Sequence, residues 1–150
     1  MRLRVLSVGK DRSGLFQPGV DTYAGRIRRY LPFELVELPA SKQRDPRKAR
    51  EDEGARLVSA AAGDIVALDV GGKALSSEAF AALLEEAMVS GRELDFVIGG
   101  DEGLSEGLLK AAHRRLSLGP MILPHRLARL VLVEQIYRGL SILRGEPYHK

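Results

Sequence analysis

The stretch that decides the fold is LSLGPMILPHRLARLVLVEQIYRGLSILRGEPYHK, residues 116–150. It opens with an apolar loop over residues 119–123. Pro124 follows where the first turn of a helix is expected, because proline lacks an N–H that would find no partner there. Apolar residues then recur at steps of three and four, which predicts a long helix: Leu127, Leu130, Val131, Ile136, Tyr137, Leu140 and Leu143. Since Leu132 and Val133 widen this surface, we expect the helix to cover its own sheet and also to meet a second subunit.

Upstream of this stretch, strand and helix patterns alternate along the chain. Strands are predicted over residues 3–8, 33–38, 64–69, 94–98 and 114–118. Helices are predicted between them, with N-caps at Asp21, at Ser76 or Ser77 and at Ser105, and with Pro46 starting the helix that reaches Ala62. This alternation predicts a single α/β domain, residues 1–150, in which helices cover both faces of a parallel sheet.

Composition limits the class of protein. The 150 residues, 45% of them apolar and 29% charged, are typical of one soluble globular domain. There is no cysteine, and the three histidines show no metal-ligand spacing, so we expect no metal site. Arg2 and Arg4 in the first strand argue against a signal peptide, and no apolar run reaches membrane-spanning length, so we expect a cytoplasmic protein with no membrane partner. The net charge of +3 permits a polyanionic partner.

Residues 41–56 are dense in charge and allow two interpretations. In one, they form a solvated helix surface on which opposite charges four residues apart make ion pairs, as in Arg47 with Glu51. In the other, the leading basic residues contact RNA phosphates: Lys42, Arg44, Arg47 and Lys48. The sequence leaves both open.

A ligand site is expected at the carboxyl ends of the strands, where open α/β sheets bind their ligands. Two glycine-rich turns are predicted there, over residues 70–73 and 99–103, and the apolar loop 118–123 forms a third wall. Glycine lets a ligand approach the backbone, and apolar side chains suit a flat heterocycle such as adenine. The chain lacks the G-x-G-x-x-G and P-loop patterns of pyrophosphate binding and the G-x-S-x-G elbow of hydrolases.

Four segments together resemble a known family. They are Leu68-Asp69 with Gly72-Lys73, IGGDEGLS at residues 98–105, the L-x-L-P-H-x-L-x-R-x-x-L-x-E-Q-x-Y-R pattern read roughly across residues 121–138, and the terminal PYHK. These are similar to the ribosomal RNA large subunit methyltransferase H family, of the SPOUT class of methyltransferases. The resemblance spans essentially the whole chain, and the terminal motif is its most specific part.

The resemblance implies a fold, a cofactor and a substrate. The fold would be a parallel-sheet SPOUT fold with a C-terminal trefoil knot, working as a homodimer. The cofactor would be S-adenosyl-L-methionine, and the substrate a pseudouridine in helix 69 of 23S rRNA, methylated on N3 within the assembled ribosome. The family's cofactor pocket falls on these positions: Leu68, Gly99, Leu118, Gly119, Pro120, Met121, Ile122 and Leu123.

Three residues near the C-terminus are expected to act in catalysis. The N3 atom must lose a proton, and His149 could act as the general base. Tyr148 could stack on or hydrogen-bond the base, and Arg138 could neutralise developing charge or hold a phosphate. We expect the tail to serve the cofactor pocket of the partner subunit. Without the resemblance, Tyr148 and His149 would more simply be an idle terminus, and the Arg138 stem would cover apolar surface.

Two further side chains have a structural interpretation. His125 is expected to hydrogen-bond a loop carbonyl, and Glu134 to pair with an arginine across the dimer, because an unpaired buried carboxylate is costly. The competing classes of function are a ribosome-associated binding module without catalysis and a SPOUT methyltransferase that acts on tRNA.

Overall fold

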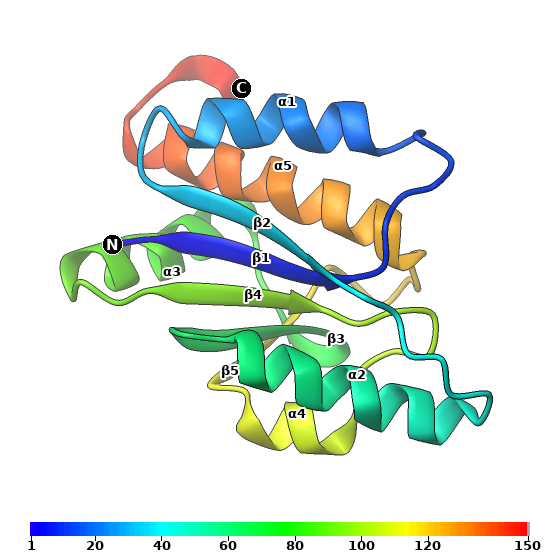
Figure 1. The fold of residues 1–150 in the computed structure, drawn as a ribbon. Coiled ribbons are helices and arrows are strands. Elements are labelled where there is room, and N and C mark those ends of the chain that lie inside the picture. The colour runs from blue at the N-terminus through cyan, green and yellow to red at the C-terminus, as the bar shows by residue number, and fades with distance from the viewer. Residues whose placement is uncertain (150) are drawn as a thin grey trace.

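A five-stranded parallel sheet carries the other elements of this computed structural model, which describes residues 1–149 (Figure 1). The strand order is β2-β1-β4-β3-β5. The strands are β1 (Leu3–Val8), β2 (Phe33–Leu38), β3 (Asp64–Ala74), β4 (Leu94–Ile98) and β5 (Arg114–Ser117), and each neighbouring pair runs in parallel. The predicted α/β class is thereby confirmed.

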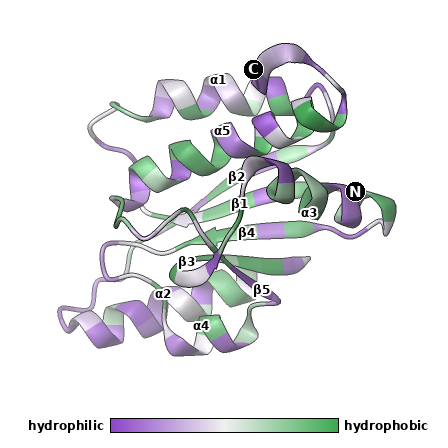
Figure 2. Ribbon diagram, turned by 180° about the vertical axis from the view of Figure 1, so that it is seen from behind, coloured by the Kyte–Doolittle hydropathy of each residue, from purple (hydrophilic) through white to green (hydrophobic). Residues whose placement is uncertain are grey.

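Helices cover both faces of the sheet (Figure 1). One face carries α1 (Gln17–Ile27), α3 (Ser77–Val89) and α5 (His125–Leu143), and the other carries α2 (Pro46–Ala60) and α4 (Glu106–Ala111). The larger apolar core lies beneath the first three helices, and a smaller one lies beneath α2 and α4. Green, the colour of hydrophobic residues, is more extensive along α5 than along α2 in Figure 2. Within residues 1–149, no helix is both long and apolar enough to cross a bilayer.

The start of α1 differs from the prediction. Asp21 was expected to cap this helix, which instead begins four residues earlier, at Gln17. The reason is Asp11, whose Oδ2 accepts hydrogen bonds from the backbone N–H groups of Phe16 (2.7 Å) and Gln17 (3.0 Å). A carboxylate from the preceding loop thus satisfies donors that a cap residue usually satisfies. The helix ends at Ile27.

Strand β3 is longer than predicted, because the expected turn over residues 70–73 belongs to it. Leu68 and Lys73 are both in register with Leu116, so the four residues between them bulge out before pairing with β5 resumes. Gly72 makes this possible, since a Cβ there would lie 2.7 Å from the backbone carbon of Arg115. The bulge directs Asp69 to the carboxyl edge of the sheet, where it lines the cavity described below.

The buried face of α5 is rotated from the predicted stripe. Its buried apolar residues are Leu132, Val133, Ile136 and Leu140, whereas Leu127, Leu130, Val131 and Leu143 are only partly buried. The rotation arises because α5 packs on the sheet between α1 and α3 and contacts both helices. Because α5 carries apolar side chains on two sides, the sequence does not tell which side is buried until the positions of α1 and α3 are known.

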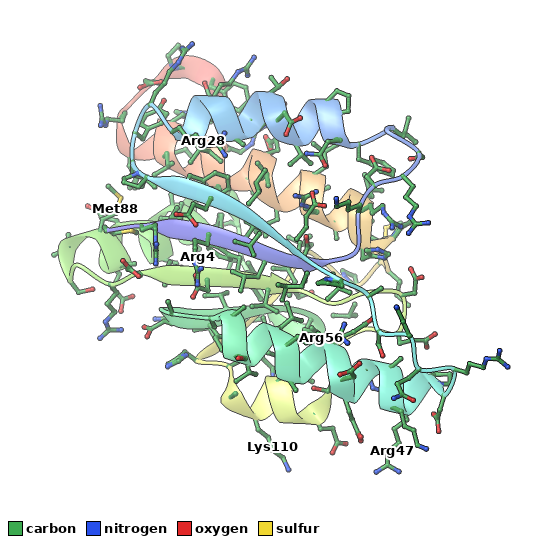
Figure 3. All side chains as sticks on the ribbon, in the orientation of Figure 1. Arg4, Arg28, Arg47, Arg56, Met88 and Lys110 are labelled. Carbon is green, nitrogen blue, oxygen red and sulfur yellow. The ribbon has the colours of Figure 1, made fainter. Side chains whose placement is uncertain are left out.

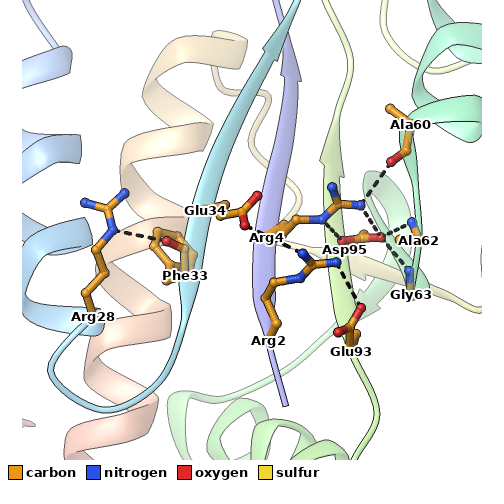
Figure 4. A network of polar contacts seen from close by, with 10 residues as sticks. All are labelled: Arg2, Arg4, Arg28, Phe33, Glu34, Ala60, Ala62, Gly63, Glu93 and Asp95. Carbon is orange, nitrogen blue, oxygen red and sulfur yellow. Dashed lines mark hydrogen bonds and ion pairs between the residues drawn. The ribbon is translucent and has the colours of Figure 1, made fainter.

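A buried ion pair ties the end of α2 to the centre of the sheet (Figure 4). The Asp95 carboxylate, 1% exposed, accepts hydrogen bonds from Arg4 Nε at 2.8 Å and Nη2 at 3.0 Å. It also accepts the N–H groups of Ala62 and Gly63, both at 2.7 Å, just after α2 ends. Both carboxylate oxygens are therefore hydrogen-bonded, which is the condition under which a buried charge is tolerated.

The charged surface of α2 shows ion pairs of the predicted kind. Arg47 Nε lies 3.2 Å from Glu51, and Arg56 Nη2 lies 2.9 Å from Asp52. Arg47 projects away from the sheet in Figure 3, and its side chain is 78% exposed. The solvated-helix interpretation therefore accounts for these pairs, each of which contributes little to stability because water screens it.

Candidate functional site

A cavity of about 950 Å³ opens at the carboxyl ends of the strands. Its walls come from the segments that follow β1, β4 and β5, from the bulged part of β3 and from the first turn of α5. This is the edge at which parallel sheets bind ligands, and the volume is that of a small-molecule site. The topology therefore gathers segments that are far apart in the sequence.

The cavity brings together all but one of the residues predicted to hold the cofactor. Leu68 comes from β3, Gly99 from the loop after β4, and the others from the loop after β5: Leu118, Gly119, Met121, Ile122 and Leu123. Pro120 is exposed and lies outside the lining. Met121 and Ile122 are 79% and 84% exposed, which places them at the rim.

A fourth wall was not predicted. Asp11, Arg12, Ser13 and Phe16, in the loop after β1, also line the cavity. This loop is held in place by Arg126 of α5, whose Nε donates to the Lys10 carbonyl at 2.9 Å, and by the Asp11 bonds to the start of α1. The sequence did contain a signal for this wall, because the loop follows the first strand, and the carboxyl ends of all strands in a parallel sheet lie at the same edge.

The lining suits a ligand that has a flat apolar part and charged groups. Leu68, Ile98 and Leu116 supply apolar surface, and the lining also contains charged residues of both signs: Asp11, Asp69, Asp101, Arg12 and Arg126. Such a wall fits S-adenosyl-L-methionine, whose adenine needs apolar contact and whose sulfonium and ammonium groups carry positive charge. The cavity could therefore hold this cofactor with residues of the chain alone. Among residues 1–149, no group of histidine and carboxylate side chains is arranged to hold a metal ion.

Two glycines make the site geometrically possible. A Cβ at Gly99 would lie 2.6 Å from the Gly103 carbonyl oxygen, so the tight loop over residues 99–103 requires glycine at this position. Gly119 has a φ of +126°, a conformation that residues with a side chain rarely adopt. These positions show why the two loops can turn sharply beside a ligand.

His125 stands at the cavity wall beside Asp101. Its Nδ1 lies 3.2 Å from Asp101 Oδ1, so its partner is a carboxylate and the predicted loop carbonyl is wrong. Burial and the positive charge of Arg126 lower the pKa of His125, although Asp101 opposes them. The imidazole is therefore neutral near pH 7, and the arrangement joins the start of α5 to the loop that follows β4.

The predicted catalytic residues lie away from the cavity of their own chain. Tyr148 and His149 belong to a short 3-10 helix (Pro147–His149) that packs along α5. The Tyr148 hydroxyl lies 3.3 Å from Glu134 Oε1 and 3.2 Å from the Tyr23 hydroxyl. Glu134 is nine residues beyond His125, or roughly 13 Å along the helix. In Figure 1 the chain turns back at the end of α5 that lies away from the carboxyl ends of the strands, and the C-terminal segment then ends beside α1.

Arg138 shares this location. Its guanidinium lies 5.0 Å from the centre of the Tyr148 ring and pairs with Glu134, with Nη2 2.6 Å from Oε1. Glu134 therefore pairs with an arginine of its own helix, and its pairing across the dimer stays a prediction. The contact within the helix arises from the four-residue spacing, which brings the two side chains together on one helix surface.

Comparison with known proteins agrees with this architecture. A family model described as "Predicted SPOUT methyltransferase" matches residues 1–149. A protein of Anaeromyxobacter sp. (strain Fw109-5) named ribosomal RNA large subunit methyltransferase H is 48% identical over 153 residues, with all of both chains covered. A protein of the same name from Stenotrophomonas maltophilia (strain R551-3) is 43% identical over 155 residues, covering 100% of this chain and 99% of the relative.

A solved structure supports the fold at greater distance. The structure described as a probable methylase family protein from Haemophilus influenzae Rd KW20 superposes with a TM-score of 0.55 at 13% identity. The alignment covers 99% of this chain and 70% of that one. The likeness lies in the arrangement of strands and helices, since so few residues are shared.

Proposed function

The chain belongs to the SPOUT methyltransferases named ribosomal RNA large subunit methyltransferase H, and on that premise we propose that it methylates N3 of a pseudouridine in 23S rRNA. The cofactor is S-adenosyl-L-methionine. The target is position 1915 in the usual rRNA numbering, in helix 69 of the assembled ribosome. The observation that carries the proposal is the cavity at the carboxyl edge, where segments that are far apart in the sequence bring together apolar surface and charged side chains.

Methyl transfer requires the protein to align the methyl donor with the nucleophile and to remove one proton. S-adenosyl-L-methionine, when bound, supplies a methyl group whose sulfur leaves as a neutral thioether, so no acid is needed. The cavity residues hold the donor, and holding the nucleophile in line with it can remove several kcal/mol from the barrier. The ring N3 must give up its proton before or as the N–C bond forms, and a base must accept that proton.

We propose that the tail supplies this base. His149 accepts the N3 proton, Tyr148 contacts the uracil-type ring, and Arg138 stabilises the negative charge that develops on it. Burial, followed by contact with Tyr23 and Glu134, raises the pKa of Tyr148. Tyr148 therefore stays protonated near neutral pH and can donate a hydrogen bond, but it does not act as the base.

The active unit we propose is a homodimer with composite sites. Tyr148 and Arg138 do not line the cavity of their own protomer. Arg138 lies on α5 beyond the cavity, and Tyr148 lies on the 3-10 helix that packs against α5 there. A second subunit would let one protomer's tail meet the other's cavity, and the partly exposed apolar residues Leu127 and Val131 offer surface for that contact. We also propose the C-terminal trefoil knot, since α5 returns from the edge strand β5 to pack between α1 and α3.

The basic rim of the cavity supports an RNA substrate. Arg12 and Arg126 line it, and Lys10 is adjacent. A chain with a net charge of +3 has modest electrostatic attraction for RNA, so a dimer-wide surface and the shape of an assembled particle would have to add affinity. We therefore propose that the ribosome, rather than naked RNA, is the substrate.

Radiolabelled methyl transfer tests the proposal. The enzyme is incubated with labelled S-adenosyl-L-methionine and ribosomes that lack the modification, with free 23S rRNA and tRNA in parallel, and the labelled nucleoside is identified after digestion. We expect methyl-pseudouridine only with assembled ribosomes. Label in tRNA would favour a SPOUT methyltransferase that acts on tRNA. Cofactor binding without methyl transfer would show that the proposed substrate is wrong. If the protein neither binds the cofactor nor transfers a methyl group, a binding module without catalysis is favoured.

Gly99→Ala is expected to weaken cofactor binding at least about tenfold. The added Cβ would lie 2.6 Å from the Gly103 carbonyl, so the loop over residues 99–103 must move, and overpacking of this kind typically costs about 1–3 kcal/mol. Isothermal titration with S-adenosyl-L-methionine measures the change in Kd. The matched control is Gly107→Ala, whose Cβ would approach nothing closer than 3.9 Å. Equal affinity in the two variants would contradict the proposed role of this loop.

A further inference from the structure

One carboxylate organises the region where the tail docks. Glu134, whose side chain is 17% exposed, accepts hydrogen bonds from Arg138 Nε at 2.8 Å and from Gln135 Nε2 at 2.9 Å. The Tyr148 hydroxyl approaches the same carboxylate, 3.3 Å from Oε1. Gln135 is itself fixed to α3, because its Oε1 accepts the hydroxyl of Ser77 at 2.7 Å. Glu134 is therefore connected to two of the three proposed catalytic residues and to a neighbouring helix.

Further contacts hold the tail against the same surface. The Tyr148 ring lies edge-on to Tyr137, with ring centres 4.6 Å apart, and Arg138 lies over its face. A hydroxyl has one proton. The Tyr148 hydroxyl can therefore donate to the Glu134 carboxylate and at the same time accept a hydrogen bond from the Tyr23 hydroxyl, whose oxygen is 3.2 Å away.

The chain between α5 and the tail is also fixed. Gly145, with a φ of +67°, reverses the chain after α5, and the backbone N–H of Glu146 donates to the Ser141 carbonyl at 2.9 Å. The Glu146 side chain accepts the hydroxyl of Tyr30 at 2.6 Å. The last residues are thus held at two points, the turn at Glu146 and the contact at Glu134.

We propose that Glu134 is the positioning residue of the tail, and that its carboxylate holds Arg138 and Tyr148 in one geometry so that His149 is presented to the partner's cavity. This inference rests on the proposed composite site. Glu134 does not line the cavity of the described chain and acts only through the two side chains that it orients. Its hydrogen bond also raises the pKa of Arg138, which keeps that side chain charged.

The test compares Glu134→Gln with Glu86→Gln as the matched control, because Glu86 also contacts an arginine but lies exposed on α3. The glutamine substitution keeps the size of the side chain and removes its charge, and charge-assisted hydrogen bonds are roughly twice as strong as neutral ones. The measurements are the release of C-terminal residues by carboxypeptidase Y, kcat and KM for ribosomes, the Kd for S-adenosyl-L-methionine, and the melting temperature.

For Glu134→Gln we expect Tyr148 to be released on the order of tenfold faster and kcat to fall on the order of tenfold, with the cofactor Kd and the melting temperature unchanged. Tyr148→Phe added to this variant should lower kcat less than it does alone, since coupled residues are not additive. Tyr23→Phe should loosen the tail to a smaller degree, which gives a second measurement on the same contact.

Several outcomes would overturn the inference. They are a tail as protected as in the wild type, a loosened tail with full kcat, and a loss of cofactor affinity or stability that accounts for the lower kcat. Failure of the proposed function has a different signature. In that case the wild-type protein transfers no methyl group to ribosomes, and the protease rates alone then decide whether Glu134 holds the tail.

Discussion

His149→Ala is expected to lower kcat for methylation of the ribosome by about a hundredfold or more, which is the usual contribution of a positioned general base. The cofactor Kd should stay unchanged, because His149 does not line the cavity of its own chain. Its Nδ1 is buried and has no hydrogen-bond partner among the described residues. Single-turnover methyl transfer, measured at saturating cofactor, gives the rate.

The control for this substitution is His113→Ala. His113 lies just before β5 and accepts the backbone N–H of Ile65 at 2.9 Å, and its side chain is exposed. We expect it to leave kcat within about twofold of the wild type, as surface substitutions away from a site do. A His149→Ala enzyme with full kcat would show that the proton leaves N3 by another route.

A mixed dimer decides which cavity His149 serves. His149→Ala and Gly99→Ala protomers with different affinity tags are co-expressed, and the mixed dimer is isolated by two purification steps. If the tail acts across the dimer, one of its two composite sites combines an intact cavity with an intact tail, and activity returns. The assay uses a cofactor concentration well below the Kd of Gly99→Ala, at which that cavity is largely empty. If each tail acts on its own cavity, both sites are then defective, and the mixed dimer shows only the low activity of the two parent variants.

Asp95→Ala is expected to destabilise the fold by about 3–5 kcal/mol, the range for breaking one side of a buried ion pair. The substitution leaves the largely buried Arg4 guanidinium and the N–H groups of Ala62 and Gly63 without their shared acceptor. Urea unfolding at pH 7 measures the difference in free energy. Glu51→Ala is the control, since its partner Arg47 is exposed and such surface pairs contribute about 1 kcal/mol or less.

The effect of Asp95→Ala should depend on pH. Burial alone would raise the pKa of Asp95, but the hydrogen bonds from Arg4, Gly63 and Ala62 outweigh it, and the folded-state pKa lies below its ordinary value. The stabilisation is therefore fully present above the unfolded pKa of about 3.9 and is lost as pH falls through the lower folded pKa. We expect the difference between variant and wild type to shrink in strong acid. A difference that is the same at pH 7 and in strong acid would contradict this assignment.

Much of the fold could be predicted because its signals are local. Five apolar runs separated by helical patterns identified the strands, and Ser76 and Ser105 marked helix starts where the structure has them. The side-chain oxygens of the two serines accept backbone N–H groups three residues ahead, which is a contact within one turn of helix. Such features depend only on nearby residues and can be read without knowing the rest of the chain.

The errors arose where distant residues decide the structure. Asp11 caps α1 from the preceding loop, and Gly72 lets β3 resume its pairing against Arg115 after a bulge. The buried face of α5 was misjudged because α1 and α3 had not yet been placed beside it. In each case a contact with residues outside the local sequence pattern decided the structure.

The α/β class, the order of the elements and the family could be read from the amino-acid sequence, because they follow from hydrophobic period and from motifs such as IGGDEGLS and the terminal PYHK. The folded molecule was needed to show that the loop after β1 joins the cavity, that Asp95 neutralises Arg4, and that Tyr148 lies against Glu134 and Tyr23. The two kinds of feature differ in the distance along the chain over which they act. Period and capping act over a few residues, whereas a cavity wall or a buried charge pair exists only once segments far apart in the chain have been brought into contact.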